Sequence, residues 1–401
     1  MTTAVLDSSE TLAQRLVRRQ LSRLEHGELT VAGETYGRGG GLEATVHVHD
    51  PRFYAEVAYG GSVGAGEAYM LGYWDADDLT AVLRILAANR GAMEGLEGGL
   101  ARLSAPLRKL LHWRARNTRG GSRRNIAAHY DLGNDFFALI LDPTMMYSSA
   151  VFEHPAMTLE QASVAKLERI CRRLELAPGE RVLEIGTGWG GFALHAASRY
   201  GVHVTTTTIS EEQHALAAER VRAAGLGERV TLLRRDYRDL EGRYDKLVSI
   251  EMIEAVGHEY FETFFAKCAS LLAERGAMLL QAITIADRRY DAARRSVDFI
   301  KRHIFPGCCI PSVTRLVSAA TRASDLRLVH LDDIGPHYAT TLRRWRENLL
   351  REAARVRALG YPARFIRMWD FYLSYCEAGF AERALGDVQA LFARPNSGTQ
   401  P

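Results

Sequence analysis

Residues 181–191 read RVLEIGTGWGG, an apolar stretch that runs into glycines at positions 186, 188, 190 and 191. Such glycines let the chain turn tightly and bring backbone N–H groups and a helix N-terminus close to a ligand. Apolar strand patterns and helical patterns alternate around this stretch. We expect strands at 181–185, 203–209, 230–234, 246–250, 277–283 and 327–331, and helices such as 211–224 and 260–272. This alternation predicts an α/β protein with a doubly wound, mainly parallel sheet.

The glycine run alone fits both a dinucleotide site and a site for S-adenosylmethionine. A dinucleotide site normally has an acid about 20 residues further on, at the end of the second strand. That strand ends here in TTTTIS, with Thr208 and Ile209 in place of the acid. Glu184 instead stands two residues before the first glycine, where a carboxylate would attract the cationic amino-acid end of S-adenosylmethionine and repel pyrophosphate. The pattern therefore favours a methyltransferase over a dehydrogenase.

Composition sets broad limits on the function. The 401 residues are 47% hydrophobic and 25% charged, with a formal net charge of +3, which gives no reason to expect a nucleic-acid partner. The five cysteines lack CxxC spacing and the N-terminus lacks an apolar signal core, so we expect a cytoplasmic protein without a metal site. No apolar run reaches about 18 residues, so contact with lipid would be peripheral.

We expect a small N-terminal α+β domain over 1–100, a basic linker over 101–124 and a cofactor-binding domain over 125–401. The linker begins ARLSAPLRKLLHWRARN and contains no acid. Its mixture of leucines and arginines is typical of a helix that lies on an anionic bilayer, and equally of a linker helix that packs on a neighbouring domain. Both interpretations stay open at this point.

A series of motifs resembles the cyclopropane-fatty-acyl-phospholipid synthase family, which includes the mycolic acid cyclopropane synthases. The motifs are NIAAHYDLGNDFFALILDPTMMYSSAVF (125–152), LEIGTGWGG, TISEEQ, VSIEMIEAVGHEYFETFF, IFPGCCIPS, PHYATTLRRW and FIRMWDFYLSYCEAGF. They occur in the family's order over about residues 40 to 395. The resemblance implies a class I methyltransferase fold, a Rossmann-like doubly wound sheet with a small N-terminal α+β domain, and S-adenosyl-L-methionine as cofactor.

The resemblance also implies which residues bind the cofactor. Tyr147 and Ser148 match positions at its methionine end, and Tyr237 and Arg238 match positions that flank its adenine. The glycine loop and the positions near the ribose complete the set together with the acid discussed above: Glu184, Gly186, Gly188, Gly190, Thr208, Ile209 and Gln213.

The resemblance further implies a catalytic group built around a bicarbonate ion, which serves the family as a general base. The matching positions are Glu254, Tyr338, Ile283, Gln281 and Ser149. Two of them depart from the family pattern, because Gln281 stands where the family usually has histidine and Ser149 where it usually has cysteine. Glutamine donates a hydrogen bond but cannot titrate, so both the bicarbonate and the ring-forming outcome are less firmly implied than the cofactor. Cys376 matches a family active-site cysteine, but its aromatic helix favours a small buried residue over a nucleophile, because the chemistry needs no covalent enzyme intermediate.

The expected reaction is transfer of a methyl or methylene carbon to the double bond of an unsaturated fatty acyl chain of a phospholipid. A carbocation forms, so the site needs negative charge and aromatic faces, for which Phe137, Tyr147, Tyr260, Trp369 and Tyr372 are candidates. The leading expectation is a cyclopropane product. A methylene- or methyl-branched product and a lipid-binding protein without catalysis are the alternatives. We also expect peripheral association with the inner face of the membrane, and the resemblance favours a homodimer.

Overall fold

The computed structural model describes residues 11–91 and 133–397, and these divide into two compact units. One unit comprises residues 1–110 with 362–378, and the other 111–361 with 379–401. The sequence-based domain boundaries remain a prediction, and the basic linker at 101–124 lies outside the described residues. No helix in the described ranges is long and apolar enough to cross a membrane.

The first unit contains a four-stranded sheet in the order β2-β1-β3-β4. Its strands are β1 (Gly27–Val31), β2 (Glu34–Gly39), β3 (Glu43–Val48) and β4 (Trp74–Ala76), and its helices are α1 (Leu12–Leu21), α2 (Arg52–Met70) and α3 (Leu79–Ala88). Most of α17 (Ala363–Ala381) belongs to the same unit. Asp370 of α17 accepts a hydrogen bond from the Tyr69 hydroxyl at 2.5 Å, and Arg367 donates to the carbonyl of Trp74 at 2.8 Å. A late helix is thus tied to the beginning of the chain.

The second unit is built on a seven-stranded sheet in the order β10-β11-β9-β8-β5-β6-β7. The strands are β5 (Arg181–Ile185), β6 (His203–Thr207), β7 (Val230–Leu233), β8 (Tyr244–Ile250), β9 (Leu272–Ile285), β10 (Arg327–Asp333) and β11 (Leu385–Ala393). The six strands expected from the sequence are confirmed. The strand that was not expected is β11, which pairs antiparallel with both β9 and β10 and makes the sheet mixed.

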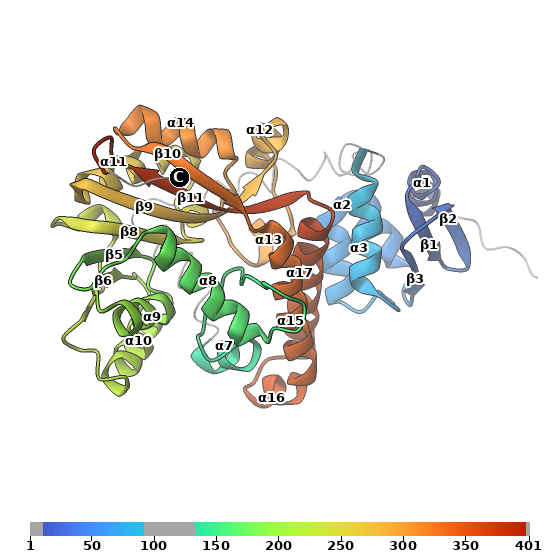
Figure 1. Cartoon of the computed structure of the whole chain (residues 1–401). Helices are drawn as coiled ribbons and strands as arrows, with labels where there is room; N and C mark the ends of the chain where they lie inside the picture. Colours follow the sequence, from blue (N-terminus) through green and yellow to red (C-terminus); the bar gives the residue numbers. More distant parts are fainter. Residues whose placement is uncertain (1–10, 92–132, 398–401) are drawn as a thin grey trace, which may run out of the picture. The chain divides into compact units, whose positions relative to one another are not determined.

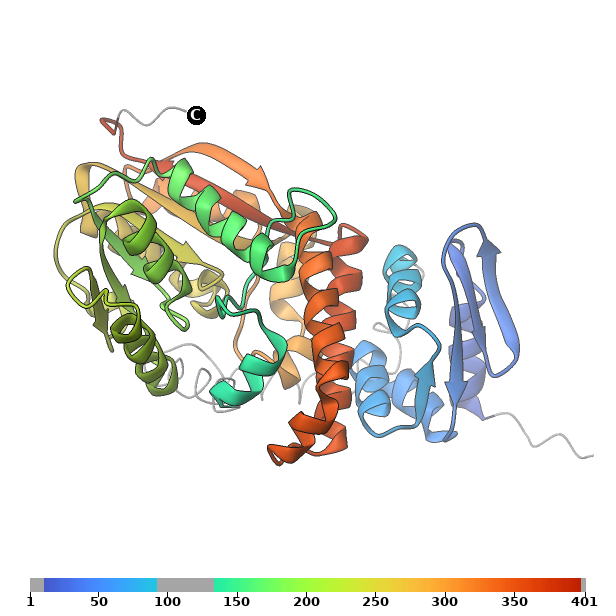
Figure 2. The same cartoon turned by 60° about the horizontal axis from the view of Figure 1, so that its bottom comes forward.

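Helices cover both faces of this sheet (Figure 1). They are α7 (Asn134–Ile140), α8 (Leu159–Arg173), α9 (Gly191–Tyr200), α10 (Glu211–Ala223), α11 (Phe261–Leu271), α12 (Asp287–Arg295), α13 (Phe299–His303), α14 (Val313–Ala323), α15 (Gly335–Arg351) and α16 (Ala353–Ala358). In Figure 2, α8 runs across one face of the sheet. Neighbouring residues of β5 enter opposite cores: Val182 packs with α8 and α9, and Leu183 packs with α11 and α14. Burial on both faces explains the nearly continuous apolar strands.

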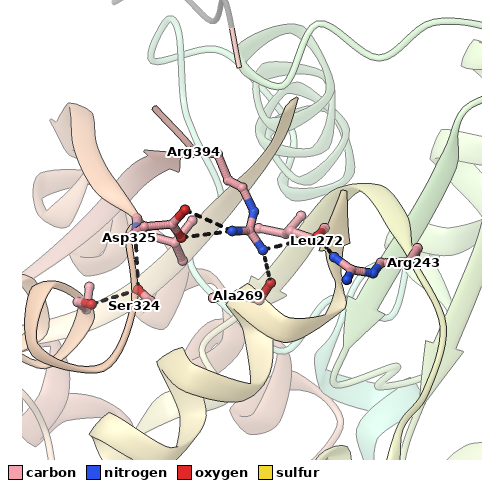
Figure 3. Close-up of polar contacts among 8 residues, drawn as sticks. Arg243, Ala269, Leu272, Ser324, Asp325 and Arg394 are labelled. Carbon is pink, nitrogen blue, oxygen red and sulfur yellow. Dashed lines mark hydrogen bonds and ion pairs between the residues drawn. The ribbon is translucent and has the colours of Figure 1, made fainter. Parts of the chain in front are cut away.

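An arginine fixes the end of β11 (Figure 3). Arg394 donates to both carboxylate oxygens of Asp325 at 3.0 and 2.9 Å, and also to the carbonyls of Ala269 and Leu272. Arg243 donates to the same Leu272 carbonyl at 3.0 Å. These bonds connect β11 to the start of β9 and to the turn before β10. The inserted strand is therefore held at a defined position along the sheet.

Candidate active site

The loop after β5 has the geometry of a ligand cradle. Gly186, Gly188 and Gly190 have φ angles of +105°, +51° and +84°, a region that L side chains rarely adopt. A Cβ added at Gly188 would meet no atom within 4 Å, so this part of the loop borders open space. Helix α9 begins at Gly191 and presents its N-terminal end beside the loop. The loop thus fits a ligand that approaches the backbone closely.

Glu184 lies at the carboxyl end of β5 and is only 2% exposed. Its carboxylate accepts a hydrogen bond from the Thr206 hydroxyl at 2.6 Å, and that hydroxyl lies 2.7 Å from the Thr187 hydroxyl. Burial raises the pKa of Glu184 to about 8. A neighbouring positive charge would favour its ionised form, as the amino group of S-adenosylmethionine would.

The remaining residues expected at the cofactor follow β6 and β7. The Thr208 hydroxyl donates to Gln213 at 3.0 Å, and Ile209 lies between Thr208 and the start of α10. Tyr237 and Arg238 lie on a short 3-10 turn after β7. The guanidinium of Arg238 lies 5.5 Å from the ring centre of Tyr237. The carboxyl ends of these strands meet at one edge of the sheet, which brings the residues predicted to bind the cofactor to the same edge.

Tyr147 and Ser148 precede α8. The ring of Tyr147 packs against Phe137 and Trp345, each with centroids 5.2 Å away. The Ser148 hydroxyl accepts a hydrogen bond at 2.7 Å from Lys166, whose ammonium is completely buried on α8. Burial lowers the pKa of Lys166 to about 8 against the raising effect of nearby acids, first Glu251.

Three of the residues expected around bicarbonate converge on a carboxylate of the chain itself. Glu251 follows β8 and accepts hydrogen bonds from the Ser149 N–H at 2.8 Å, the Gln281 Nε2 at 2.7 Å and the Tyr338 hydroxyl at 2.6 Å. Ser149 uses its backbone here, while its hydroxyl donates to the Ala150 carbonyl. Hydrogen bonds of this kind stabilise an ionised carboxylate.

Glu254 lies three residues further on and is 9% exposed. One carboxyl oxygen accepts from the Ile283 N–H at 2.6 Å, and the other has no hydrogen-bond partner among the described residues. Burial and then the charge of Glu251 raise the pKa of Glu254 to about 8. At neutral pH Glu254 is therefore mainly protonated.

A family model described as mycolic acid cyclopropane synthetase matches residues 118–390, well over half of the chain. The chain belongs to this family. It is an S-adenosylmethionine-dependent methyltransferase, and the sequence-based prediction of the family, the fold and S-adenosylmethionine as cofactor is confirmed. Its mixed seven-stranded sheet with a small N-terminal sheet is the corresponding α/β class I methyltransferase fold.

Relatives in this family carry different names at equal identity. A tuberculostearic acid methyltransferase of Mycobacterium tuberculosis is 38% identical over 93% of this chain and 88% of its own length. The cyclopropane-fatty-acyl-phospholipid synthase of Escherichia coli is also 38% identical, over 88% of this chain and 89% of its own. The mycolic acid cyclopropane synthase solved with S-adenosylhomocysteine and CTAB is 30% identical, with a TM-score of 0.64 over 68% of this chain and 98% of its own.

The other residues expected at the site lie on α17 and just before α11. Cys376, Trp369 and Tyr372 belong to the part of α17 that is grouped with the first unit. Tyr260 comes just before α11 and lies 6.0 Å from the guanidinium of Arg238. The roles of all these residues stay predictions.

Sequence reasoning missed Glu251 as a member of the site. The available signal was an acid directly after a buried strand of a doubly wound sheet, where functional side chains commonly lie. The family motif distinguishes Glu254 of the same segment and not Glu251. Lys166 was missed because helical periodicity does not separate a completely buried lysine from a surface one.

Proposed function

We propose that this enzyme transfers a methylene carbon from S-adenosylmethionine to the double bond of an unsaturated fatty acyl chain of a phospholipid, forming a cyclopropane ring through a carbocation. The observation that carries the proposal is the Glu251 carboxylate, which three donors hold beside the mainly protonated Glu254. The two relatives described above are both named for fatty acyl products.

The cofactor supplies an electrophilic methyl group on a sulfonium. An isolated alkene is a weak nucleophile, and the cation left on the acyl chain has no lone pair to quench it. The site must therefore provide negative charge and exclude water. Glu251 provides the charge, and the packed rings of Phe137, Tyr147 and Trp345 provide aromatic surface that repels water and tolerates a cation.

Glu251 then acts as the general base. A C–H bond of the transferred carbon breaks, its electron pair forms the third C–C bond of the ring, and the proton goes to a Glu251 carboxylate oxygen. Gln281 cannot take this proton, because an amide does not titrate in this range. Its hydrogen bond at 2.7 Å instead orients the carboxylate.

Glu251 accepts hydrogen bonds from residues that the family resemblance assigns to bicarbonate. The Ser149 N–H, the Gln281 amide and the Tyr338 hydroxyl would each have to donate to that ion, and all three donate to Glu251. We propose that the Glu251 carboxylate performs the ion's role in this chain. Turnover in carbonate-depleted buffer tests this, since a requirement for added bicarbonate would contradict it.

A second candidate function is formation of a methylene- or methyl-branched chain. The tuberculostearic acid methyltransferase, which aligns with 93% of this chain, favours it. A methylene branch requires a hydride shift along the acyl chain before the proton leaves, and that proton leaves from the same transferred carbon. Glu251 serves either outcome, so the two products differ in the lifetime of the cation and not in the identity of the base.

The proposed substrate is membrane phospholipid, reached peripherally from the cytoplasmic face. The basic segment 101–124 is the proposed contact, on the evidence of its sequence. Neutralising Arg114, Arg116, Arg123 and Arg124 should weaken binding to anionic vesicles and leave cofactor binding intact. Unchanged vesicle binding would remove this role. The homodimer remains a prediction, which sedimentation would test.

The function is tested by incubating the purified enzyme with S-adenosylmethionine and vesicles of unsaturated phospholipid. We expect a lipid that is heavier by one CH₂, lacks the alkene protons and shows upfield ring protons in NMR spectra. Vinylidene protons would instead identify the methylene-branched product. Cofactor binding without turnover of any unsaturated lipid would contradict both functions and indicate a lipid-binding protein.

A further inference from the structure

Asp387 is a buried carboxyl group to which the reaction above assigns no role. It lies on β11, is 0% exposed and pairs in register with Ile283 of β9. Its Oδ2 accepts a hydrogen bond at 3.2 Å from Gln281, the residue that also donates to Glu251. Its Oδ1 is buried and has no donor among the described residues. A buried acid with an unpartnered oxygen is costly unless it carries a proton.

The side-chain amide of Gln281 donates hydrogen bonds to both Glu251 and Asp387. Gln389 donates to the Gln281 Oε1 at 3.0 Å and so fixes which end of the amide faces them. The Gln281 Nε2 then lies 2.7 Å from Glu251 and 3.2 Å from Asp387. One amide group thus serves two carboxyl groups, and the second oxygen of Asp387 receives no N–H or hydroxyl donor from the described residues.

The charges that face Asp387 oppose its ionisation. Glu251 and Glu254 are acids, and Lys166 is the cation. Burial, followed by the charge and hydrogen bonding of Glu251, raises the pKa of Asp387 well above its usual range, and Lys166 offsets this only in part. Two carboxyl groups in such contact commonly hold one proton between them.

We propose that Asp387 is a positioning residue that stays protonated and shares its proton with Glu251, so that the negative charge of the pair resides on Glu251. This inference rests on the proposed role of Glu251 as the base. The pair holds one proton before the reaction and two after the C–H bond breaks. The additional proton leaves to water before the next turnover.

Infrared difference spectra in D₂O test the protonation state without requiring any turnover. The spectrum of the Asp387→Asn variant is subtracted from that of the wild-type enzyme at pH 7. We expect the lost signal to be the carbonyl band of a protonated carboxylic acid. Loss of a carboxylate band instead would overturn the proposal. Asp370→Asn is the matched control, because Asp370 is also buried but accepts its hydrogen bond from Tyr69 in the other unit.

Measurements of kcat for two variants distinguish a positioning role of Asp387 from a role in packing alone. Asparagine can still donate an N–H to Glu251 and accept from Gln281, whereas alanine can do neither. We expect Asp387→Ala to lower kcat on the order of 100-fold with unchanged binding of S-adenosylhomocysteine, and Asp387→Asn to retain most of kcat. Wild-type kcat in the alanine variant, or equal losses in both variants, would overturn the role.

Failure of the proposed function gives a different pattern. A wild-type enzyme that alters no unsaturated lipid would contradict the function, and the infrared result would still report the proton on Asp387. A wild-type enzyme that turns over while the infrared experiment shows an ionised Asp387 would overturn this inference alone.

Discussion

Replacing Glu251 by glutamine tests the base with little disturbance of its surroundings. Oε1 of the new side chain can accept from the Ser149 N–H and the Gln281 amide as the carboxylate does. Its Nε2 can donate to the Tyr338 oxygen, because that hydroxyl can rotate and accept. The variant therefore keeps three hydrogen bonds and loses only the charge and the ability to accept a proton.

The magnitude follows from this difference. Replacing charge-assisted hydrogen bonds by neutral ones costs about 1 kcal/mol each, which the fold and the cofactor site can tolerate. Loss of a general base lowers rates by about 10²- to 10⁴-fold, equivalent to about 3 to 5 kcal/mol in the barrier. We therefore expect kcat to fall by at least about 100-fold while the affinity for S-adenosylhomocysteine stays nearly constant.

The assay is formation of S-adenosylhomocysteine in a single turnover with unsaturated phospholipid vesicles, with cofactor affinity measured by calorimetry. Glu251→Gly provides a second arm, because Glu251 has a φ angle of +47° that glycine adopts without strain. The glycine variant leaves the donors of Ser149, Gln281 and Tyr338 without an acceptor, so added bicarbonate should restore part of its activity. Glu251→Gln should not respond. Wild-type kcat in Glu251→Gln would refute the assignment of the base.

Three further variants test other parts of the site. Tyr338→Phe removes the 2.6 Å bond to Glu251 and should lower kcat about tenfold, which steady-state kinetics would measure; an unchanged kcat would exclude a role for this hydroxyl. The pKa of Glu184 is about 8 in the folded state, against 4.5 as the ordinary value expected in the unfolded chain. The stability that its protonated form contributes is therefore fully present below pH 4.5 and is lost as the pH rises to about 8. Glu184→Gln should flatten this loss by up to about 1.4 kcal/mol per pH unit in denaturant titrations, and an unaltered slope would contradict the assignment. Gly188→Ala should lower the free energy of unfolding by about 1 kcal/mol, because Gly188 has a φ of +51°. The added Cβ would enter the open side of the loop and should weaken cofactor binding; undiminished affinity would place the cofactor elsewhere.

The sequence predicted the parallel part of the sheet because its strands are apolar on both faces. It did not predict β11, whose residues LGDVQALFA include Asp387 and Gln389 in otherwise apolar surroundings. Polar residues inside a strand ordinarily argue against burial. Here each finds a partner across the sheet, where Gln389 and Asp387 both bond Gln281 of β9. Such pairing depends on the antiparallel register of two segments about 100 residues apart, which local patterns do not contain.

The acids of the site show a similar limit. Family motifs brought forward Glu254 and Ile283 as ligands of a bicarbonate ion, and in the structure the Ile283 N–H donates to the Glu254 carboxylate. The same motifs gave Gln281 and Ser149 as departures without explaining them. Both residues donate to Glu251, a residue that no motif distinguished. The departures are understood only together with the carboxylate that they hold, and that association required three-dimensional contacts.

Binding of the cationic cofactor is expected to change the charge distribution of the site. Lys166 is mainly protonated at neutral pH and is the buried cation that acts on Glu251, Asp387 and Glu184. In the proposed state, with Asp387 and Glu254 protonated, Lys166 is the counterion of the Glu251 carboxylate. Burial raises the pKa of Glu184 to about 8 and Lys166 lowers it only in part, so Glu184 is also mainly protonated until a further positive charge supports its ionised form. The arrival of a cationic cofactor supplies that charge and favours loss of the Glu184 proton. We therefore expect cofactor binding to influence the proposed base Glu251 through Lys166, which donates a hydrogen bond to the Ser148 hydroxyl, a predicted cofactor contact.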